Sequence, residues 1–581
     1  MSLRNSGNLR KLEPDERIGL AQELFGELEN EDSFRQEGLR CYNFLNGVQW
    51  EESELKTLKA RKQPAMVFNL IKPVVNSIES LQKGNRSEIA YKPEDSSGHD
   101  FIASKVITTV SKHDLRRIKF EVTESDAFRD YLVTGRGATQ AFYNDNKEMI
   151  GMEKIDFRNL YIDKSSRKDD LTDCSHLHIA EYISEAEVNV MFADEANLIG
   201  GESSMVNEDN AMVAGSHSDR VRVVYTWAKI PVKDTVGYHF EYDCLVWKDG
   251  VHLAYYENPY PQLKNYPISI MTLYRDLDNL PYGMVRGMID AQRSYNHSRS
   301  KISHILNTRK YVYREGAFDG SDVELANKLS QVDAVIGLEN GADDIQDVTQ
   351  YYDIQHLWTM AKESKDVIRE IAGLSEELQG SGSGSLSGKA IKLRQDSGIM
   401  RLTEVFDGLA QWKTEVGKAV MGIIIGNYTN ARVSRILIAG GKEEFEDKEQ
   451  REKAVKLWSA LNVDGLEEYD IVHDTDAVSI SQQEQEYQDL LQVYSMNPEA
   501  IPLSAIIQAS SMINKDKTLA IMDEHDQLKQ GYAQAQQQLE QAQQQSQAVA
   551  EQHESVVQEL MAKNEKLENS IVKIMQKTGA M

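Results

Sequence analysis

The sequence predicts a helix-dominated α+β fold with a long helical extension at its C-terminal end. Apolar residues recur with helical spacing over residues 15–60 and again over 101–145. Between about residues 150 and 275 the pattern changes to short β-branched and aromatic runs separated by turn residues. From residue 481 onward the pattern is helical again, and glutamine dominates residues 530–552.

The composition is that of a folded, acidic protein with several structural units. The chain has 581 residues, 40% of them hydrophobic, which excludes a wholly disordered chain. At roughly 100–200 residues per domain, this length predicts about three to five units. The 65 Lys and Arg residues against 92 Asp and Glu residues give a net charge of −27. This charge argues against broad electrostatic adhesion to nucleic acid or anionic membranes.

Cysteine usage and hydropathy favour a reducing compartment and no membrane segment. The three cysteines, Cys41, Cys174 and Cys244, are odd in number and far apart, so we expect no disulfide framework. The first residues are polar and charged, without the apolar run of a secretory signal. The longest apolar stretch, Ala419–Ile425, is far shorter than the roughly 20 residues of a membrane helix. We therefore expect a soluble protein assembled in the cytoplasm.

The first 145 residues predict a helical frame. Residues 15–60 carry leucines four residues apart with charge between them, as a helix requires. Gln63-Pro64 interrupts this pattern, and a second helix is expected over 68–83. A break at Gly135-Arg136-Gly137 then ends the helical pattern before a strand at Ala138–Tyr143.

The region from 150 to 275 predicts hairpins. Gly237 and Asp249-Gly250 are turn signals between apolar runs, and residues 200–219 have the composition of a surface loop. The expected strands are Asp156–Ile162, His176–Tyr182, Val221–Trp227 and Tyr238–Trp247.

The remaining chain alternates helices with short irregular segments. Pro281 begins an uninterrupted polar helix, since proline is tolerated at a helix start. The expected elements are strands at Tyr311–Tyr313 and Ala334–Ile336, helices at 321–330 and 353–378, a flexible Gly/Ser segment at 379–388, a long helix over Lys389–Asn427, and strands at Val433–Ile438 and Tyr469–His473.

A loose heptad underlies the glutamine-rich tail. Leu539, Leu560 and Leu567 share one heptad position, but polar and alanine residues interrupt the seam. Such a seam suits a helix packed among several copies of itself, or a tail that is only partly ordered. The sequence leaves both interpretations open.

The segment Gly384-Ser-Leu-Ser-Gly388-Lys389 only partly matches a phosphate-binding loop. Such a loop needs four residues between the glycines and Ser or Thr after the lysine, whereas here there are three and Ala390 follows. A flexible loop between two long helices is the better interpretation. The cations beyond it, Lys389, Lys392 and Arg394, suit either a phosphate backbone or the solvated face of a helix start.

No motif predicts catalysis or a cofactor. Cys174, His176 and His178 alternate, so on a strand they would share one face and resemble a zinc site. A fourth ligand and the usual paired spacing are missing, so ordinary strand residues are favoured. Nucleophile-elbow, metalloprotease and dinucleotide motifs are also missing from the sequence, and we expect no enzyme.

The helix at 282–310 is locally basic. Its six cations against Asp290 give a charge of +5: Arg286, Arg293, Arg299, Lys301, Arg309 and Lys310. Such a helix borders nucleic acid or docks on acidic neighbours. Taken alone, a partner protein or another copy is favoured over nucleic acid.

Several short motifs occur in a characteristic order over residues 40–430. They are Phe44-Leu-Asn-Gly47-Val-Gln-Trp50, Pro64-Ala-Met-Val-Phe-Asn69, Ile71-Lys-Pro73, Asn85-Arg86, Gly135-Arg-Gly137, Asp156-Phe-Arg-Asn-Leu-Tyr-Ile-Asp163, Pro281-Tyr-Gly283, Asp290-Ala-Gln-Arg-Ser-Tyr-Asn296 and Ser387-Gly-Lys-Ala390. With these motifs, the sequence resembles the portal proteins of tailed bacteriophages, especially those of short-tailed, podovirus-type phages with long C-terminal helical extensions.

The resemblance implies a ring of twelve copies at one capsid vertex, through which double-stranded DNA enters and leaves. It implies this order of parts: a wing at 1–280 with the β-rich block at about 150–275, a first stem helix at 281–310, a clip at 311–352, a second stem helix at 353–378, a tunnel loop at 379–388, a long helix and return to the wing at 389–480, and a helical crown with a Gln-rich barrel at 481–581.

The resemblance also implies where DNA passes and which proteins bind. The tunnel loop contains Gly380, Gly382, Gly384 and Gly388, and the candidate DNA-channel cations are Lys389, Lys392, Arg394, Arg293, Arg299 and Lys301. The implied partners are the terminase large subunit, head–tail adaptor and tail proteins, and the major capsid and scaffolding proteins. The expected location is the portal vertex of the virion, after assembly in the host cytoplasm, with no cofactor and no sequence-specific DNA reading.

Two other classes of protein compete with the portal. One is a coiled-coil scaffold, assembly chaperone or other virion component whose Gln-rich tail drives association. The other is an NTPase that uses the Gly388-Lys389 loop. Deletion of residues 481–581 tests the first, and a hydrolysis assay of Lys389→Ala tests the second.

Overall fold

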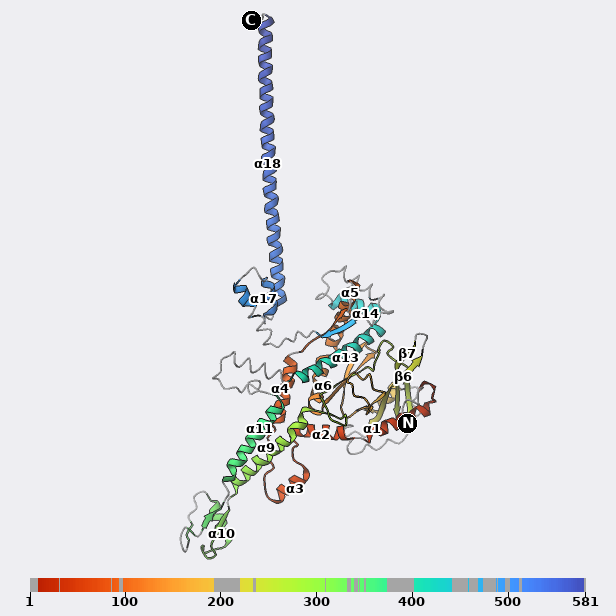
Figure 1. Cartoon of the computed structure of the whole chain (residues 1–581), viewed down its shortest axis with the longest axis vertical. Coiled ribbons are helices and arrows are strands. Elements are labelled where there is room, and N and C mark those ends of the chain that lie inside the picture. Colours follow the sequence, from red (N-terminus) through yellow and green to blue (C-terminus); the bar gives the residue numbers. More distant parts are fainter. Residues whose placement is uncertain are drawn as a thin grey trace. The chain divides into compact units, whose positions relative to one another are not determined.

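A computed structural model gives the fold of most of the chain. It describes residues 9–30, 32–84, 86–93, 98–192, 220–233, 237–308, 310–331, 336–338, 343, 345–348, 352–373, 402–440, 458, 469–473, 487, 490–496, 502–510 and 515–578. The chain divides into two compact units, Met1–Ala477 and Val478–Met581 (Figure 1).

The first unit begins with the predicted helical frame. The helices are η1 (Leu9–Lys11), α1 (Pro14–Glu29), α2 (Ser33–Asn46), α3 (Glu52–Ala60), α4 (Ile71–Gly84), α5 (Gly98–Arg117) and α6 (Phe120–Thr134). The helical prediction for 15–60 is confirmed as three helices with two breaks. Helix α1 starts at Pro14 behind a capping box of Glu13 and Glu16, and α2 ends at Gly47, whose φ of 92° favours glycine.

The β-rich block forms antiparallel sheets. Its elements are β2 (Arg136–Asn144), β3 (Met149–Ile155), β4 (Leu160–Ile162), β5 (His176–Ser184), α7 (Glu185–Met191), β6 (Arg220–Lys233), β7 (Tyr238–Lys248), β8 (Val251–Tyr256), β9 (Ile268–Thr272), β10 (Tyr274–Arg275) and β11 (Pro281–Tyr282). One sheet has the order β3-β2-β9 and the other β4-β5-β6-β7-β8. Asp249 and Gly250, with φ of 46° and 83°, turn β7 into β8 as the sequence predicts.

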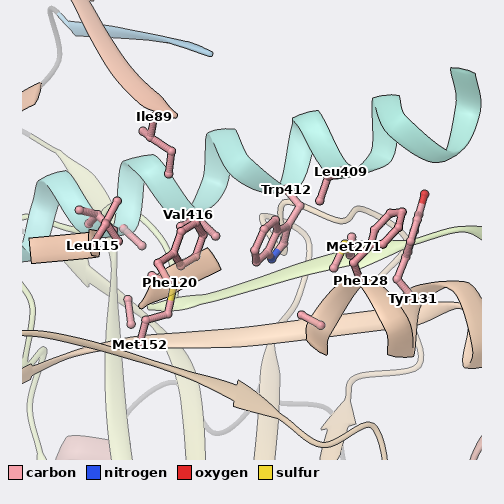
Figure 2. Packing of buried hydrophobic residues seen from close by; sticks show 14 of the residues in the cluster. Ile89, Leu115, Phe120, Phe128, Tyr131, Met152, Met271, Leu409, Trp412 and Val416 are labelled. Carbon is pink, nitrogen blue, oxygen red and sulfur yellow. The ribbon is translucent and has the colours of Figure 1, made fainter. Parts of the chain in front are cut away.

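Helix α13 (Thr403–Asn427) brings the later chain back onto this core. Its Trp412 is 1% exposed and stacks on Phe120 with ring centroids 5.9 Å apart (Figure 2). The indole Nε1 donates to the backbone carbonyl of Ser269 in β9 at 3.3 Å. The core therefore joins helix, sheet and returning helix, which confirms a helix-dominated α+β fold.

Helices α9 (Met284–Asn307) and α11 (Tyr352–Ile371) lie side by side (Figure 1). Between them lie β12 (Tyr311–Tyr313), α10 (Asp322–Ser330) and β13 (Ile345–Asp347). Strand β12 and helix α10 confirm their predictions. The partner of β12 is β13; of the strand expected at 334–336, only Ile336 lies among the described residues, and it is not in a strand.

The strand predicted at Val433–Ile438 is wrong. These residues lie in α14 (Asn430–Gly440), where Val433, Ile436 and Leu437 are buried. Their i, i+3, i+4 spacing fits one helix face, and the β-branched composition misled the prediction. The strand expected at Tyr469–His473 is confirmed: β14 pairs antiparallel with β1 (Ile89–Pro93).

The described residues of the second unit are almost all helical. It contains α17 (Leu503–Ala509) and α18 (Lys515–Thr578), a single helix of 64 residues. Apolar side chains of the loose heptad, among them Leu539, Leu560 and Leu567, are 59–62% exposed on α18. Among the described residues of both units, none of the helices combines the length and the apolar character that crossing a membrane requires.

Candidate functional site

The paired helices α9 and α11 are the candidate functional site, because three of the predicted channel cations lie on α9. Helix α9 starts where the backbone approaches the end of α6 closely. A Cβ at Gly283 would collide with the carbonyl oxygens of Val133 and Leu132, and one at Gly135, where φ is 90°, would collide with the backbone of Tyr282. The two glycines therefore fix where α9 leaves the core.

An extended segment, residues 64–70, runs along α9 and is called the strap below. Its backbone N–H groups at every second position donate to side chains on α9. Met66 donates to Ser300 Oγ at 3.0 Å, Phe68 to Asn296 Oδ1 at 3.0 Å, and Leu70 to Gln292 Oε1 at 2.9 Å. Gln292 Nε2 returns a hydrogen bond to the Phe68 carbonyl at 2.8 Å.

The two-residue repeat of the strap nearly matches the four-residue repeat of α9 in length. Two residues of extended chain advance about 6.6–6.8 Å, and four residues of an α-helix advance about 6.0 Å. Side chains at i, i+4 and i+8 of α9 therefore reach alternate N–H groups of the strap. This pairing explains why Gln292, Asn296 and Ser300 are at most 4% exposed although all three are polar.

The cations of α9 pair with acidic side chains of the same chain. Arg286 Nε lies 2.9 Å from Glu37 of α2, and Arg293 Nη2 lies 2.7 Å from Glu54 of α3. Partial burial opposes ionisation of Glu54, but hydrogen bonds from the Glu51 backbone N–H and from Arg293 hold its pKa below the ordinary value. Two cations of the basic helix thus pair with acids of the same chain, rather than with the partner protein or second copy that the sequence favours.

Arg299 and Lys301 have different surroundings. The guanidinium of Arg299 lies 4.9 Å from the ring centroids of both Phe68 and Trp358, a cation–π contact with the strap and with α11. Lys301 is exposed and, within the described part of the chain, has no ion-pair partner. No local pattern indicates the Trp358 contact, because that residue lies 59 positions further along the chain.

A pocket of about 550 Å³ opens between α3, α9 and α11. Its lining includes Trp50 and Glu54 near α3, His297 and Lys301 on α9, and Leu357 and Met360 on α11. Trp50 packs edge-on to His297 with ring centroids 4.5 Å apart. The pocket is thus part aromatic, part aliphatic and part charged. The other predicted site residues, Gly380, Gly382, Gly384, Gly388, Lys389, Lys392 and Arg394, lie outside the described residues.

Of the alternating Cys174, His176 and His178, the two histidines share one face of β5, with ring centroids 5.4 Å apart, whereas Cys174 packs elsewhere. Cys174 precedes β5 and packs with Leu177 and Ile179, whereas His178 bonds Thr226 at 2.8 Å and lies against Phe25. Burial raises the pKa of the Cys174 thiol to about 12, which disfavours a thiolate ligand. Within the described ranges no three Cys, His, Asp or Glu side chains are placed to hold a metal ion.

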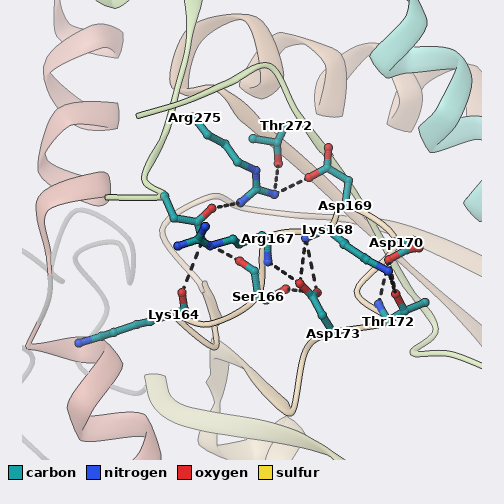
Figure 3. A network of polar contacts seen from close by, with 11 residues as sticks. Lys164, Ser166, Arg167, Lys168, Asp169, Asp170, Thr172, Asp173, Thr272 and Arg275 are labelled. Carbon is teal, nitrogen blue, oxygen red and sulfur yellow. Dashed lines mark hydrogen bonds and ion pairs between the residues drawn. The ribbon is translucent and has the colours of Figure 1, made fainter. Parts of the chain in front are cut away.

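The polar loop between β4 and β5 forms hydrogen bonds and an ion pair with residues of the same chain (Figure 3). Asp173 accepts hydrogen bonds from the Arg167 backbone N–H at 2.7 Å and from Ser166 Oγ at 2.9 Å. These bonds overcome the effect of burial and lower the pKa of Asp173. Arg275 pairs with Asp169 at 2.5 Å. The carboxylates of Asp169 and Asp173 thus face structural partners, and the loop braces the chain before α9.

Comparison with known proteins adds a family relationship to this geometry. The family model described as "Phage P22-like portal protein" matches residues 22–573. A curated relative, the portal protein of Helicobacter pylori bacteriophage KHP30, is 23% identical over 410 residues, which is 69% of this chain. The chain spans 65% of the length of that relative.

Proposed function

Because this chain belongs to the phage P22-like portal protein family, we propose that it forms a ring of twelve copies at one capsid vertex and conducts double-stranded DNA during packaging and ejection. The observation that carries the proposal is the family match over residues 22–573, which includes almost all of both structural units. The short motifs in the sequence lie within the matched residues and agree with the proposal.

The parts of the chain take their roles from this proposal. Helices α9 and α11 are the stem, residues 311–352 between them are the clip, and residues 1–280 form most of the wing. Residues 379–388 are the tunnel loop that contacts DNA, and α18 contributes to a crown or barrel. The stem role is supported by the pairing of α9 with α11 and by the small β12–β13 sheet at their ends.

Charge supports a conduit that does not hold DNA tightly. Twelve copies at −27 each give about −324. Affinity for DNA rises with the number of phosphates that cations neutralise, so an acidic ring lets a duplex slide. Lys301, Lys389, Lys392 and Arg394 are the proposed centring cations. Arg293 would reach DNA only by breaking its ion pair with Glu54. Arg299 would reach DNA only by leaving the rings of Phe68 and Trp358.

The proposed partners follow from the same role. The clip binds the terminase large subunit during packaging and head–tail adaptor proteins afterwards, while the wing contacts major capsid and scaffolding proteins. The protein itself is a structural component of the virion at the portal vertex. Nucleotide hydrolysis comes from the terminase, so no catalytic residue is assigned to this chain.

Electron microscopy of the purified full chain tests the proposal. We expect rings in negative stain, predominantly twelvefold, with rings of neighbouring size tolerated. A stable monomer under assembly conditions would contradict it. A variant lacking residues 481–581 should still form rings, because the proposed contacts lie in the wing and stem; loss of all oligomers would favour a tail-driven scaffold instead.

A further inference from the structure

Helix α11 presents two different, partly exposed flanks beside its contact with α9. Ala361, Ser364 and Ile368 face α9 and are at most 8% exposed, and Ser364 Oγ donates to Ser294 Oγ at 3.1 Å. At 100° per residue, Trp358 and Met360 lie about 200° apart around the helix axis. They therefore project from opposite sides of the α9–α11 pair.

One flank is aromatic and basic, and is called the indole face. It consists of Trp358, Lys362, Lys365 and Arg369, whose spacings of four, three and four residues align them along α11. Trp358 is 55% exposed although its ring packs on Arg299. A half-exposed tryptophan in a line of cations is typical of the centre of a protein interface rather than of a solvated helix.

The other flank is aliphatic and is called the aliphatic stripe. It consists of Met360, Val367 and Ile371, which are 50%, 43% and 41% exposed. At its upstream end Met360 joins the 550 Å³ pocket, together with Leu357, Trp50 and His297. An exposed row of apolar side chains that ends in a partly aromatic pocket favours an interaction surface.

Acidic residues follow the basic ones along the same helix. Lys362 precedes Glu363, Lys365 precedes Asp366, and Arg369 precedes Glu370. The exposed acidic side chains lie between the indole face and the aliphatic stripe. Each acid is one residue, or about 1.5 Å along the axis, from a cation. Trp358 likewise lies at nearly the same height along the axis as two residues of the pocket, Leu357 and Met360, which are one and two residues away.

We propose that the indole face of one copy docks on the aliphatic stripe of the next copy, with Trp358 inserted into that copy's pocket. The inference rests on the proposed ring. Rotation about an axis along the helix pair keeps heights unchanged, so two surfaces of one chain meet in a ring only if they lie at the same height. Trp358 and the pocket satisfy this condition, and so do the three cation–acid pairs.

A second copy fits these flanks better than DNA does. A phosphate backbone would use the cations of the indole face but would leave Met360, Val367 and Ile371 in water. A neighbouring copy covers both flanks at once, and it brings the acids that border its aliphatic stripe near the cations. The pocket is then completed by a side chain from the adjacent subunit.

Disulfide trapping of the full chain tests the proposal. Thr57 of α3 is exposed and lines the pocket. We expect Trp358→Cys combined with Thr57→Cys to give, under mild oxidation, a ladder of covalent oligomers up to the whole ring. Thr359→Cys combined with Thr57→Cys is the matched control, since Thr359 is exposed but rotated by about 100°. Background is low because Cys41, Cys174 and Cys244 are buried.

Trp358→Ala supplies a measurement without oxidation. Removal of a central tryptophan should raise the protein concentration for half-maximal ring assembly by roughly 30-fold or more. Rings in the micrographs with a ladder no stronger than in the control would overturn this interface while the portal function stands. Intact rings of Trp358→Ala that fail only in packaging DNA would instead make the indole face a channel surface and overturn the proposal. If the wild-type chain forms no rings, the portal proposal itself fails.

Discussion

Asn296 Oδ1 on α9 accepts a hydrogen bond of 3.0 Å from the backbone N–H of Phe68, 228 residues earlier in the chain. The Asn296 side chain also donates to Gln49 Oε1 at 2.6 Å. Two of the sequence motifs that order the chain, Pro64–Asn69 and Asp290–Asn296, are therefore the two halves of one contact.

Asn296→Ala should destabilise this contact measurably. The substitution leaves the Phe68 N–H and the Gln49 carbonyl oxygen unpaired in a buried place, at a cost of about 1–3 kcal/mol for each group. We expect faster amide exchange in peptides that contain the strap and a lower denaturation midpoint. Asn307→Ala, at an exposed position of the same helix, is the control; equal exchange in both variants would contradict the pairing.

Lys413 and Glu124 form a buried ion pair that should be sensitive to removal of one partner. Their atoms are 2.9 Å apart, and both side chains are 3% exposed. Lys413→Met leaves the Glu124 carboxylate buried without its cation, which typically costs about 3–5 kcal/mol. Lys413→Met with Glu124→Leu should recover most of the loss in a denaturation titration.

A surface pair provides the comparison for that titration. Lys418 Nζ lies 2.8 Å from Glu415, with the lysine side chain 56% exposed. Lys418→Met should cost no more than about 1 kcal/mol. Similar losses in the free energy of unfolding for Lys413→Met and Lys418→Met would contradict a special cost of unpairing the buried Glu124.

Acidic pH should destabilise the first unit through His178. Burial lowers the pKa of this imidazole well below its usual value of 6.5. The unfolded chain therefore binds a proton near pH 6.5 that the folded chain does not bind, so the free energy of unfolding falls as the pH drops below 6.5. Above that pH neither state binds the proton, so His178 costs the folded state no stability. The slope approaches about 1.4 kcal/mol per pH unit for one proton.

His178→Gln removes this titration. Between pH 7.5 and 5 the melting temperature of the variant should fall less steeply than that of the wild type, whatever its absolute stability. His553→Gln, at an exposed position of α18, should retain the wild-type slope. An unchanged slope in His178→Gln would assign the acid sensitivity to other groups.

The proposed tunnel loop should matter for DNA and not for assembly. Deletion of several residues within 380–387 is expected to leave rings intact and to reduce packaged or retained DNA, measured as nuclease-protected genome. An equal deletion within 200–219, the other Gly/Ser-containing segment, is the matched control. Normal packaging by the 380–387 variant would argue against a role of the loop at the DNA.

Charge reversal of Lys389, Lys392 and Arg394 separates DNA contact from folding. The triple variant should change packaging yield while the melting temperature stays within about 1–2 °C, because surface substitutions usually change stability by less than about 0.5 kcal/mol. Unaltered packaging would place these side chains on a solvated helix face. Reversal of exposed Lys56, Lys59 and Lys62 controls for net charge.

Local patterns predicted most elements, and long-range contacts account for the failures. Gly250 predicts its hairpin from its own conformational freedom, and the 321–330 helix is predicted from its local pattern. Val433–Ile438 shows the limit, since β-branched residues with mixed spacing suit either state until burial against α5 decides. The polar Gln292 and Asn296 looked like surface residues because their partners in the strap are more than 200 positions away.

The positive charge of the candidate site can be predicted from the sequence, but the partners of its cations cannot. The excess of +5 on residues 282–310 left nucleic acid and acidic neighbours both open and favoured another molecule, whereas Glu37 and Glu54 are acids of the same chain that only the fold identifies. Trp358 carries no local signal at all. The alternation of cation and acid from Lys362 to Glu370 is visible in the sequence, although only the burial of Ser364 and Ile368 shows which flank each charge occupies.

The strap also has a mechanical consequence. Its hydrogen bonds to Ser300, Asn296 and Gln292 are stacked along α9 and point across the helix axis. A pull along the axis loads all of them in shear together, so they must break at once. A pull away from the axis opens them one after another. The strap therefore resists sliding of α9 along its axis far more strongly than separation of α9 from the strap. When the strap and α9 are pulled apart in a force experiment, the rupture force should depend on the direction of pulling.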